Sequence, residues 1–156
     1  MSEVYKADGA RIVGDVRFGQ SCSVWYNAVI RGDDNPITIG DRVNIQDGCT
    51  LHAGHEDPLV IGDDVTVGHN TILHGCTVES ECLIGMGSII MDKAVIHSRC
   101  VVAAGSLIPQ GKEFPSGTLI MGHPARAVRP LTEEEQHAIR QSAAYYVQCA
   151  EKQLKQ

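Results

Sequence analysis

The stretch "LIGMGSIIMDKAVIHSRCVVAAGSLI" (83–108) repeats with a period of six residues. An aliphatic residue returns at every sixth position, at Ile84, Ile90, Ile96, Val102 and Ile108. Such a period indicates short strands joined by turns, because the side chains of a strand alternate between two faces. Three segments close one triangular coil, and stacked coils form a parallel β-helix. The predicted fold class is therefore an all-β solenoid.

The six-residue register extends toward the N-terminus. Its earlier aliphatic markers, several of them followed by glycine, are Ile12, Phe18, Val24, Ile30, Ile39, Ile45, Leu51, Ile61 and Val67. A small or aliphatic residue stands two positions before each marker, at Ala10, Val16, Cys22, Ala28, Val43, Cys49, Val65, Cys76, Cys82, Ser88, Ala94, Cys100 and Ser106. Five of the six cysteines occupy this position, and only Cys149 does not. We predict that these five are buried, reduced thiols rather than disulfides or metal ligands.

The composition narrows the class of protein. The 156 residues suffice for one domain with a core, and the 43% hydrophobic content indicates a globular chain. A formal net charge of -6 argues against nucleic acid or an anionic membrane surface as a partner. No apolar run is long enough to span a bilayer, and the N-terminus has no apolar signal-peptide core. A cytoplasmic location is expected.

The C-terminal part of the sequence has a different pattern. The repeat is expected from about residue 8 to 110 and is followed by the connector "TLIMGHPARAVRP", so that residues 1–130 form the prism with its connector. Residues 131–156 are expected to form a helix, with Thr132 and Glu135 as a capping box. Its predicted apolar stripe contains Ile139, Ala143, Tyr146, Val147, Ala150 and Leu154, and should pack on the prism.

Counting three hexads per coil stacks each marker on the third marker before it. One predicted column contains Ile12, Ile30, Leu51 and Ile72, and another contains Val24, Ile45, Val67 and Ile84. The count slips once, because eleven residues rather than twelve separate Val67 from Val78. We place the slip inside "HNTILHG" (69–75). A broken local rule often marks a functional site.

Two histidines stand just outside the first column. Arg31 and His52 follow its markers directly, and His74 follows displaced by one place through the slip. Because neighbouring coils are about 4.8 Å apart, His52 and His74 are expected to be close enough to share a metal ion. His97, His123 and His137 are interpreted as surface residues, and His55 lies in the loop "AGHEDP" beside His52.

A third histidine follows the other column. His69 is expected beside Gln46 and Asp47, about 16 Å from the corner that holds His52 and His74. It therefore cannot join their ion within one chain, but it can join an ion held by a neighbouring chain. A closed ring of three subunits would then carry one three-histidine site per interface.

With these residues placed, nearly the whole chain resembles the γ-class carbonic anhydrase-like proteins of the hexapeptide-repeat family. The blocks "SVWYNAVIRGDDNPITIGDRVNIQDGCTLHAG" and "IGDDVTVGHNTILHGCTV" match the family's signatures, and "SAAYYV" resembles its C-terminal helix. The resemblance implies a left-handed prism, a homotrimer, and carbon dioxide and bicarbonate as substrates. It assigns the metal to His52, His69 and His74, with His69 donated across the interface.

The resemblance also implies roles for other polar residues. Arg31, Asp33 and Asp47 match a network at the subunit boundary, Gln46 matches a residue near the metal-bound water, Asn44 lies in the same motif, and Tyr146 matches a tyrosine that reaches the site. Three neutral imidazoles leave one position of Zn²⁺ open, where a water ionises near neutral pH to a hydroxide that can attack carbon dioxide. Iron or cobalt could take the place of zinc. In the loop after His52, both His55 and Glu56 are candidates for proton transfer.

Two alternative functions stay open. One is a coenzyme A-dependent acyltransferase, because hexapeptide-repeat proteins often have this activity and "GHPARAVRPL" resembles a segment that they share. The other is a metal-stabilised trimer with little or no catalytic activity.

Overall fold

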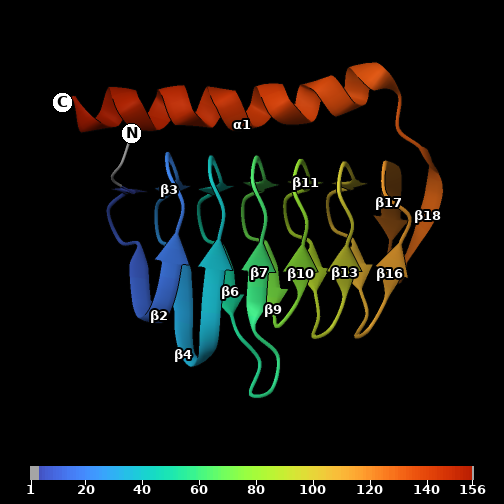
Figure 1. Ribbon diagram of the computed structural model, residues 1–156, viewed down its shortest axis with the longest axis horizontal. Coiled ribbons are helices and arrows are strands. Elements are labelled where there is room, and N and C mark those ends of the chain that lie inside the picture. Colours follow the sequence, from blue (N-terminus) through green and yellow to red (C-terminus); the bar gives the residue numbers. More distant parts are fainter. Residues whose placement is uncertain (1–3, 156) are drawn as a thin grey trace.

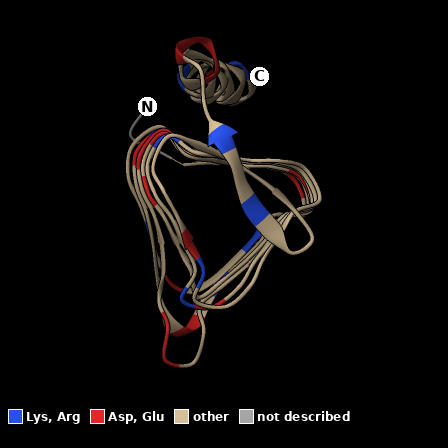
Figure 2. Ribbon diagram, turned by 90° about the vertical axis from the view of Figure 1, so that its right-hand side faces the viewer, with Lys and Arg blue, Asp and Glu red and all other residues tan. Residues whose placement is uncertain are grey.

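The computed structural model describes residues 4–155 as a triangular prism of parallel strands, with one long helix along its outside (Figures 1 and 2). The helix lies over one of the three faces (Figure 2). The prediction of a parallel β-helix with a C-terminal helix is confirmed.

One sheet forms the face under the helix. Its parallel strands, in spatial order, are β1 (Tyr5–Lys6), β3 (Ser23–Val24), β5 (Asn44–Ile45), β8 (Thr66–Val67), β11 (Leu83–Ile84), β14 (Val101–Val102) and β17 (Thr118–Gly122). β18 (Ala125–Pro130) then pairs antiparallel with β17. The expected connector is therefore a β-hairpin at the end of the prism.

A second sheet forms the other two faces, because β4 (Val29–Ile39) is long enough to take part in both. The N-terminal part of β4 begins the face that continues with β6 (Thr50–His52), β9 (Ile72–His74), β12 (Ile89–Ile90) and β15 (Leu107–Ile108). Its C-terminal part begins the face that continues with β7 (Leu59–Ile61), β10 (Thr77–Val78), β13 (Val95–Ile96) and β16 (Glu113–Phe114). β2 (Arg11–Phe18) pairs with the opposite edge of β4. The coils thus begin at Tyr5 and continue past residue 110, further at both ends than the repeat indicates.

The aliphatic markers form the core. Ile84, Ile90, Ile96, Val102 and Ile108 are all fully buried, as the six-residue register predicts. The glycine after Ile84 is required by close stacking of coils. A Cβ at Gly85 would lie 2.5 Å from the backbone nitrogen of Ala104 in the next coil, so any larger residue would push the coils apart.

The first predicted column needs one correction. β6 and β9 pair Leu51 with Leu73, not with Ile72. Leu73 is fully buried, whereas the side chain of Ile72 is 40% exposed. Six residues therefore separate Val67 from Leu73, and the shortened segment is the five-residue step from Leu73 to Val78. Its corner contains Gly75, whose φ of 52° lies in the left-handed region that glycine adopts without a steric penalty.

The five cysteines of the repeat are buried and free, as predicted. Four of these thiols, those of Cys22, Cys49, Cys82 and Cys100, donate hydrogen bonds to backbone carbonyls of the following coil, for example from Cys49 to Gly68 at 3.0 Å and from Cys22 to Gly40 at 3.0 Å. Burial raises the pKa of the Cys76 and Cys82 thiols to about 12. Such thiols are inert packing groups, because the reactive thiolate is not formed near neutral pH.

The helix α1 (Glu133–Leu154) begins with the predicted capping box. Glu135 N donates to Thr132 Oγ1, and Thr132 N donates to a Glu135 carboxylate oxygen at 2.9 Å. Ile139, Ala143 and Ala150 are buried against the prism. The prediction for Leu154 was wrong, since its side chain is 48% exposed at the end of the helix. Within residues 4–155, no helix is both long and apolar enough to cross a membrane.

Candidate metal centre

His52 and His74 face each other on adjacent coils. They end β6 and β9 and are direct partners in the strand register, so His74 is not displaced by one place. Nδ1 of His52 lies 3.1 Å from Nε2 of His74. The two side chains therefore lie close together, as predicted.

The second nitrogen of each ring is held by carboxylates. Nε2 of His52 lies 3.1 Å from Asp33 Oδ1 and 3.3 Å from Asp34 Oδ2. Nδ1 of His74 lies 2.7 Å from Asp92 Oδ1. An ionised carboxylate only accepts hydrogen bonds, so each ring donates its N–H on this side.

This arrangement leaves two lone pairs facing each other. In the neutral rings, Nδ1 of His52 and Nε2 of His74 carry no proton, and at 3.1 Å their lone pairs repel unless a cation lies between them. Two nitrogen ligands of tetrahedral zinc, each about 2.0–2.1 Å from the ion, lie about 3.3 Å apart. The pair therefore fits two ligands of one metal ion, with the carboxylates orienting the rings from behind.

His69 has the same kind of support at a different corner. Its Nδ1 lies 2.9 Å from Asp47 Oδ2, and Oδ1 of Asp47 accepts a hydrogen bond from the backbone nitrogen of Tyr26 at 3.1 Å. This leaves Nε2 of His69 available to a ligand. Across residues 4–155, the one group of three or more metal-binding side chains with all ligand atoms within 4.8 Å is Asp33, Asp34 and His52. A single chain therefore does not bring His69 to the other two histidines.

Gln46 and Asn44 lie beside the His69 corner, under the helix. Both are buried, at 6% and 1% exposure. Gln46 Nε2 donates to Asn44 Oδ1 at 3.1 Å. Gln46 and Gly68, the residue before His69, line one mostly apolar hollow of about 350 Å³ between the prism and α1.

Tyr146 belongs to the same side of the molecule. Its ring packs edge-on against Trp25, with centroids 5.6 Å apart. Burial and the nearby charge of Asp47 raise the pKa of Tyr146. The structure thus places Tyr146 near the carboxylate that holds His69, as a packing residue of α1.

Two of the three residues expected at the subunit boundary, Arg31 and Asp33, are bonded to each other. Arg31 Nη1 donates to Asp33 Oδ2 at 2.6 Å, and this hydrogen bond lowers the pKa of Asp33. Asp47 lies apart from them, bonded to His69. In the loop after β6, His55 and Glu56 are exposed, and Asn35 anchors the loop by donating to the carbonyls of Gly54 and His55, both at 2.8 Å.

Three further polar residues belong to this region and were not predicted from the sequence. Asp92 holds His74, and Thr66 and Ser142 continue the hydrogen-bond chain from Asn44. Asp92 stands eighteen residues after His74, which is one full coil, so the same counting that placed the histidines could have found it. Ser142 lies on the helix, outside the repeat, where no such count applies.

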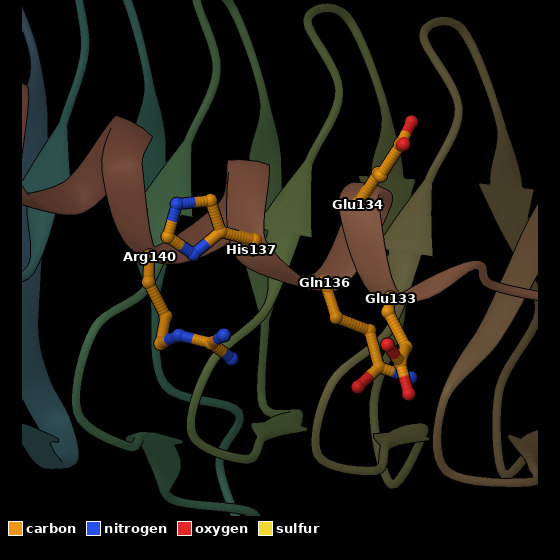
Figure 3. Close-up of a pocket in the computed structure, with 5 residues that line it drawn as sticks. All are labelled: Glu133, Glu134, Gln136, His137 and Arg140. Atoms are coloured by element: carbon orange, nitrogen blue, oxygen red, sulfur yellow. The ribbon is translucent and has the colours of Figure 1, made fainter.

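A hollow of about 440 Å³ on the helix is not part of this site. It is lined by the α1 residues Glu133, Glu134, Gln136, His137 and Arg140 (Figure 3). It is an open depression on the first turns of the helix, and none of the residues predicted for the metal centre lines it.

Comparisons with known proteins agree with the repeat. Two family models match the central coils: "Bacterial transferase hexapeptide (six repeats)" over residues 75–110 and "Hexapeptide repeat of succinyl-transferase" over residues 58–91. Gamma carbonic anhydrase 2, mitochondrial, of Arabidopsis thaliana is 43% identical over 155 residues, which cover 96% of this chain but 56% of the plant protein. The carbonic anhydrase of Geobacillus kaustophilus is 48% identical over 147 residues, covering 94% of this chain and 81% of the relative. The chain belongs to the γ-class carbonic anhydrase-like family.

Solved structures of similar sequence share the fold. A solved structure from Bacillus cereus, provisionally described as an acetyltransferase, superimposes with a TM-score of 0.94 at 48% identity and covers 96% of this chain and 87% of that one. The chain spans little more than half the length of the plant γ-class relatives.

Proposed function

We propose that the protein is a metal-dependent carbonic anhydrase that interconverts carbon dioxide and bicarbonate at the subunit interfaces of a homotrimer. His52 and His74 of one subunit and His69 of the next would bind the metal. The observation that carries this proposal is the 3.1 Å separation of Nδ1 of His52 from Nε2 of His74, with each ring backed by carboxylates.

The chemistry of this donor set suits zinc, with iron or cobalt as alternatives. When bound by three imidazoles, the ion would supply an acidified water for the hydration of carbon dioxide at neutral pH. The protein's own side chains would orient the metal ligands and the water and would carry the proton away. Asp92, Asp33 and Asp47 orient the rings, Gln46 presents its amide to the attacking water, and His55 or Glu56 in the exposed loop can carry the released proton to solvent.

Exposed apolar side chains around both corners support the trimer. On the face that carries His52 and His74, the side chains of Ile72 and Met91 are 40% and 39% exposed. Near His69, those of Tyr26 and Met86 are 44% and 58% exposed. Apolar groups gathered at the edges of a polar site are typical of a surface that another subunit covers. The ion pair of Arg31 and Asp33 would then lie at the boundary.

The Bacillus cereus structure keeps an acyltransferase function as the second candidate, because its description names that activity. That chemistry needs one catalytic histidine and a coenzyme A slot. It gives no reason for three histidines that each hold a carboxylate on one nitrogen. The paired histidines therefore favour the metal-dependent reaction.

Two assays on the same preparation separate the candidates. The first is metal content per chain, for which we expect about one ion per subunit. The second is the rate of carbon dioxide hydration by stopped flow, with and without a chelator. Bound metal with chelator-sensitive hydration supports the proposal. Bound metal without hydration indicates a structural trimer, and acetyl transfer from acetyl-coenzyme A without metal uptake indicates an acyltransferase.

A further inference from the structure

A chain of four polar side chains connects the candidate site to the C-terminal helix. Gln46 Nε2 donates to Asn44 Oδ1 at 3.1 Å, Asn44 Nδ2 donates to Thr66 Oγ1 at 2.9 Å, and Thr66 Oγ1 lies 3.1 Å from Ser142 Oγ. Asn44 and Thr66 are almost completely buried, at 1% and 3% exposure. A buried polar chain of this length costs free energy unless every bond is made, so its members constrain one another.

In the structure, the hydrogen bonds between Gln46, Asn44 and Thr66 all run from donor to acceptor in the same direction. Because the Asn44 amide donates to Thr66, its oxygen is left facing Gln46, and Gln46 must turn its NH₂ group toward Asn44. The other end of the Gln46 amide, Oε1, receives no hydrogen bond from residues 4–155. Gln46 lines the same hollow as Gly68, the residue before His69.

The helix α1 carries Ser142, the last side chain of this hydrogen-bond chain. Ser142 stands in the middle of α1, next to the fully buried Ala143 and three residues after Ile139, which is 1% exposed. The contact between Tyr146 and Trp25 fixes the following turn of the helix. The packing of α1 on the prism therefore determines where the Ser142 hydroxyl meets Thr66, although 76 residues separate the two in sequence.

We infer that Thr66 and Ser142 are positioning residues that hold the Gln46 amide with its carbonyl oxygen toward the reacting water. The inference rests on the proposed function. An oxygen at this position accepts the O–H of the attacking water and leaves a lone pair of that water free for carbon dioxide. An NH₂ group there would instead donate to the lone pair and make the water a poorer nucleophile. The orientation of one amide thus matters for the rate, and the loss of either hydroxyl would loosen the hold on it.

The decisive variant is Thr66→Val, which keeps the shape and removes the hydroxyl. The Asn44 amide then loses the hydrogen-bond acceptor that holds its orientation. Thr66→Ser restores the hydroxyl, Ser142→Ala removes the last member of the chain, and Ser142→Thr restores it. Ser98→Ala is the control, because it removes a hydroxyl bonded to Ser116 on another corner.

The first readout is the side-chain NH₂ groups of Gln46 and Asn44 in ¹H–¹⁵N NMR spectra of the metal-free protein. In Thr66→Val we expect their hydrogen exchange to accelerate about fivefold, the ratio expected for the loss of one neutral hydrogen bond. Thr66→Ser should exchange as the wild type does. Unchanged exchange in both Thr66→Val and Ser142→Ala would overturn the inference.

The second readout is carbon dioxide hydration at equal metal content. We expect Thr66→Val to lower kcat about tenfold, with little change in metal affinity, and Thr66→Ser to recover it. In a Gln46→Ala background, Thr66→Val should have little further effect, since it acts through Gln46. Full additivity of the two substitutions would contradict the inference. If the metal-loaded wild type hydrates no carbon dioxide, the proposed function fails, and the exchange measurement alone decides whether the chain orients Gln46.

Discussion

Nδ1 of His52 and Nε2 of His74 lie 3.1 Å apart on neighbouring coils, and both rings donate their remaining N–H to carboxylates. The coil spacing of the β-helix produces this approach, because the backbones of adjacent parallel strands are about 4.8 Å apart and the two histidines are in direct register. A metal site thus follows from the repeat itself once two outward positions in one column are histidines. The carboxylates fix which nitrogen each ring offers.

The first prediction concerns Asp92. Asp92→Asn keeps the side-chain size but weakens the hold on Nδ1 of His74, so we expect zinc affinity to fall about 10–100-fold. Competition with a chromophoric chelator measures this change. Asp64→Asn is the matched control, because it breaks the ion pair with Arg42 at a corner without a metal ligand. Equal zinc affinity in the two variants would show that Asp92 does not support the ligand.

The second prediction concerns removal of the metal. A metal bound by two chains stabilises the folded trimer through mass action. Treatment with a chelator should lower the Tm, and added Zn²⁺ should restore it. The same treatment should leave the Tm of the variant His52→Ala unchanged. A wild-type Tm that is insensitive to both chelator and zinc would speak against an interfacial metal.

The third prediction concerns the cysteines. Cys22, Cys49, Cys76, Cys82 and Cys100 are buried, and their thiol pKa values lie above the usual value. At pH 8 a disulfide reagent should therefore modify only the half-buried Cys149 of the native protein, and the other five after unfolding. Mass spectrometry of the labelled chain identifies the sites. Rapid modification of several of the five would mean that the register is wrong.

The fourth prediction concerns pH. His97 is hydrogen-bonded to Glu113 at 3.0 Å and to Glu79 at 3.1 Å, and these bonds raise its pKa above 6.5. The folded state therefore binds the His97 proton more tightly than the unfolded state. This stabilisation is fully present below pH 6.5 and is lost as the pH rises through the raised pKa.

The variant His97→Gln tests this sign. Its Tm should lie further below that of the wild type at pH 5.5 than at pH 8.5. The same substitution at the exposed His137 provides the comparison. A deficit for His97→Gln that grows toward high pH would contradict the expected linkage.

The hexads were sufficient to predict the prism because buried aliphatic side chains recur strictly wherever coils stack. They failed at Ile72, where two aliphatic residues adjoin and only the register of β9 shows that Leu73 points inward. The hexads also did not predict the β17–β18 hairpin, because its antiparallel strands do not follow the six-residue pattern.

The candidate site also contains residues that could be predicted from the sequence and residues that could not. His52, His74 and His69 could be placed by counting coils, since their neighbours are set by the repeat. The bond between Thr66 and Ser142 could not, because it depends on how α1 docks on the prism. Docking of a helix is determined by the packing of Ile139, Ala143 and Tyr146 in three dimensions rather than by a sequence period.

The most direct test of a site shared between subunits is the amount of zinc bound after two inactive variants are unfolded and refolded together. His69→Ala still offers His52 and His74, and His74→Ala still offers His69. With random mixing in a closed three-fold ring, about one quarter of the interfaces join them in the productive order. A mixture of His52→Ala and His74→Ala should bind none, because those two ligands come from the same chain. We therefore predict about one quarter of the wild-type zinc for the first mixture and none for the second. Absence of zinc from the first mixture, in trimers that mass spectrometry shows to be mixed, would contradict the shared site.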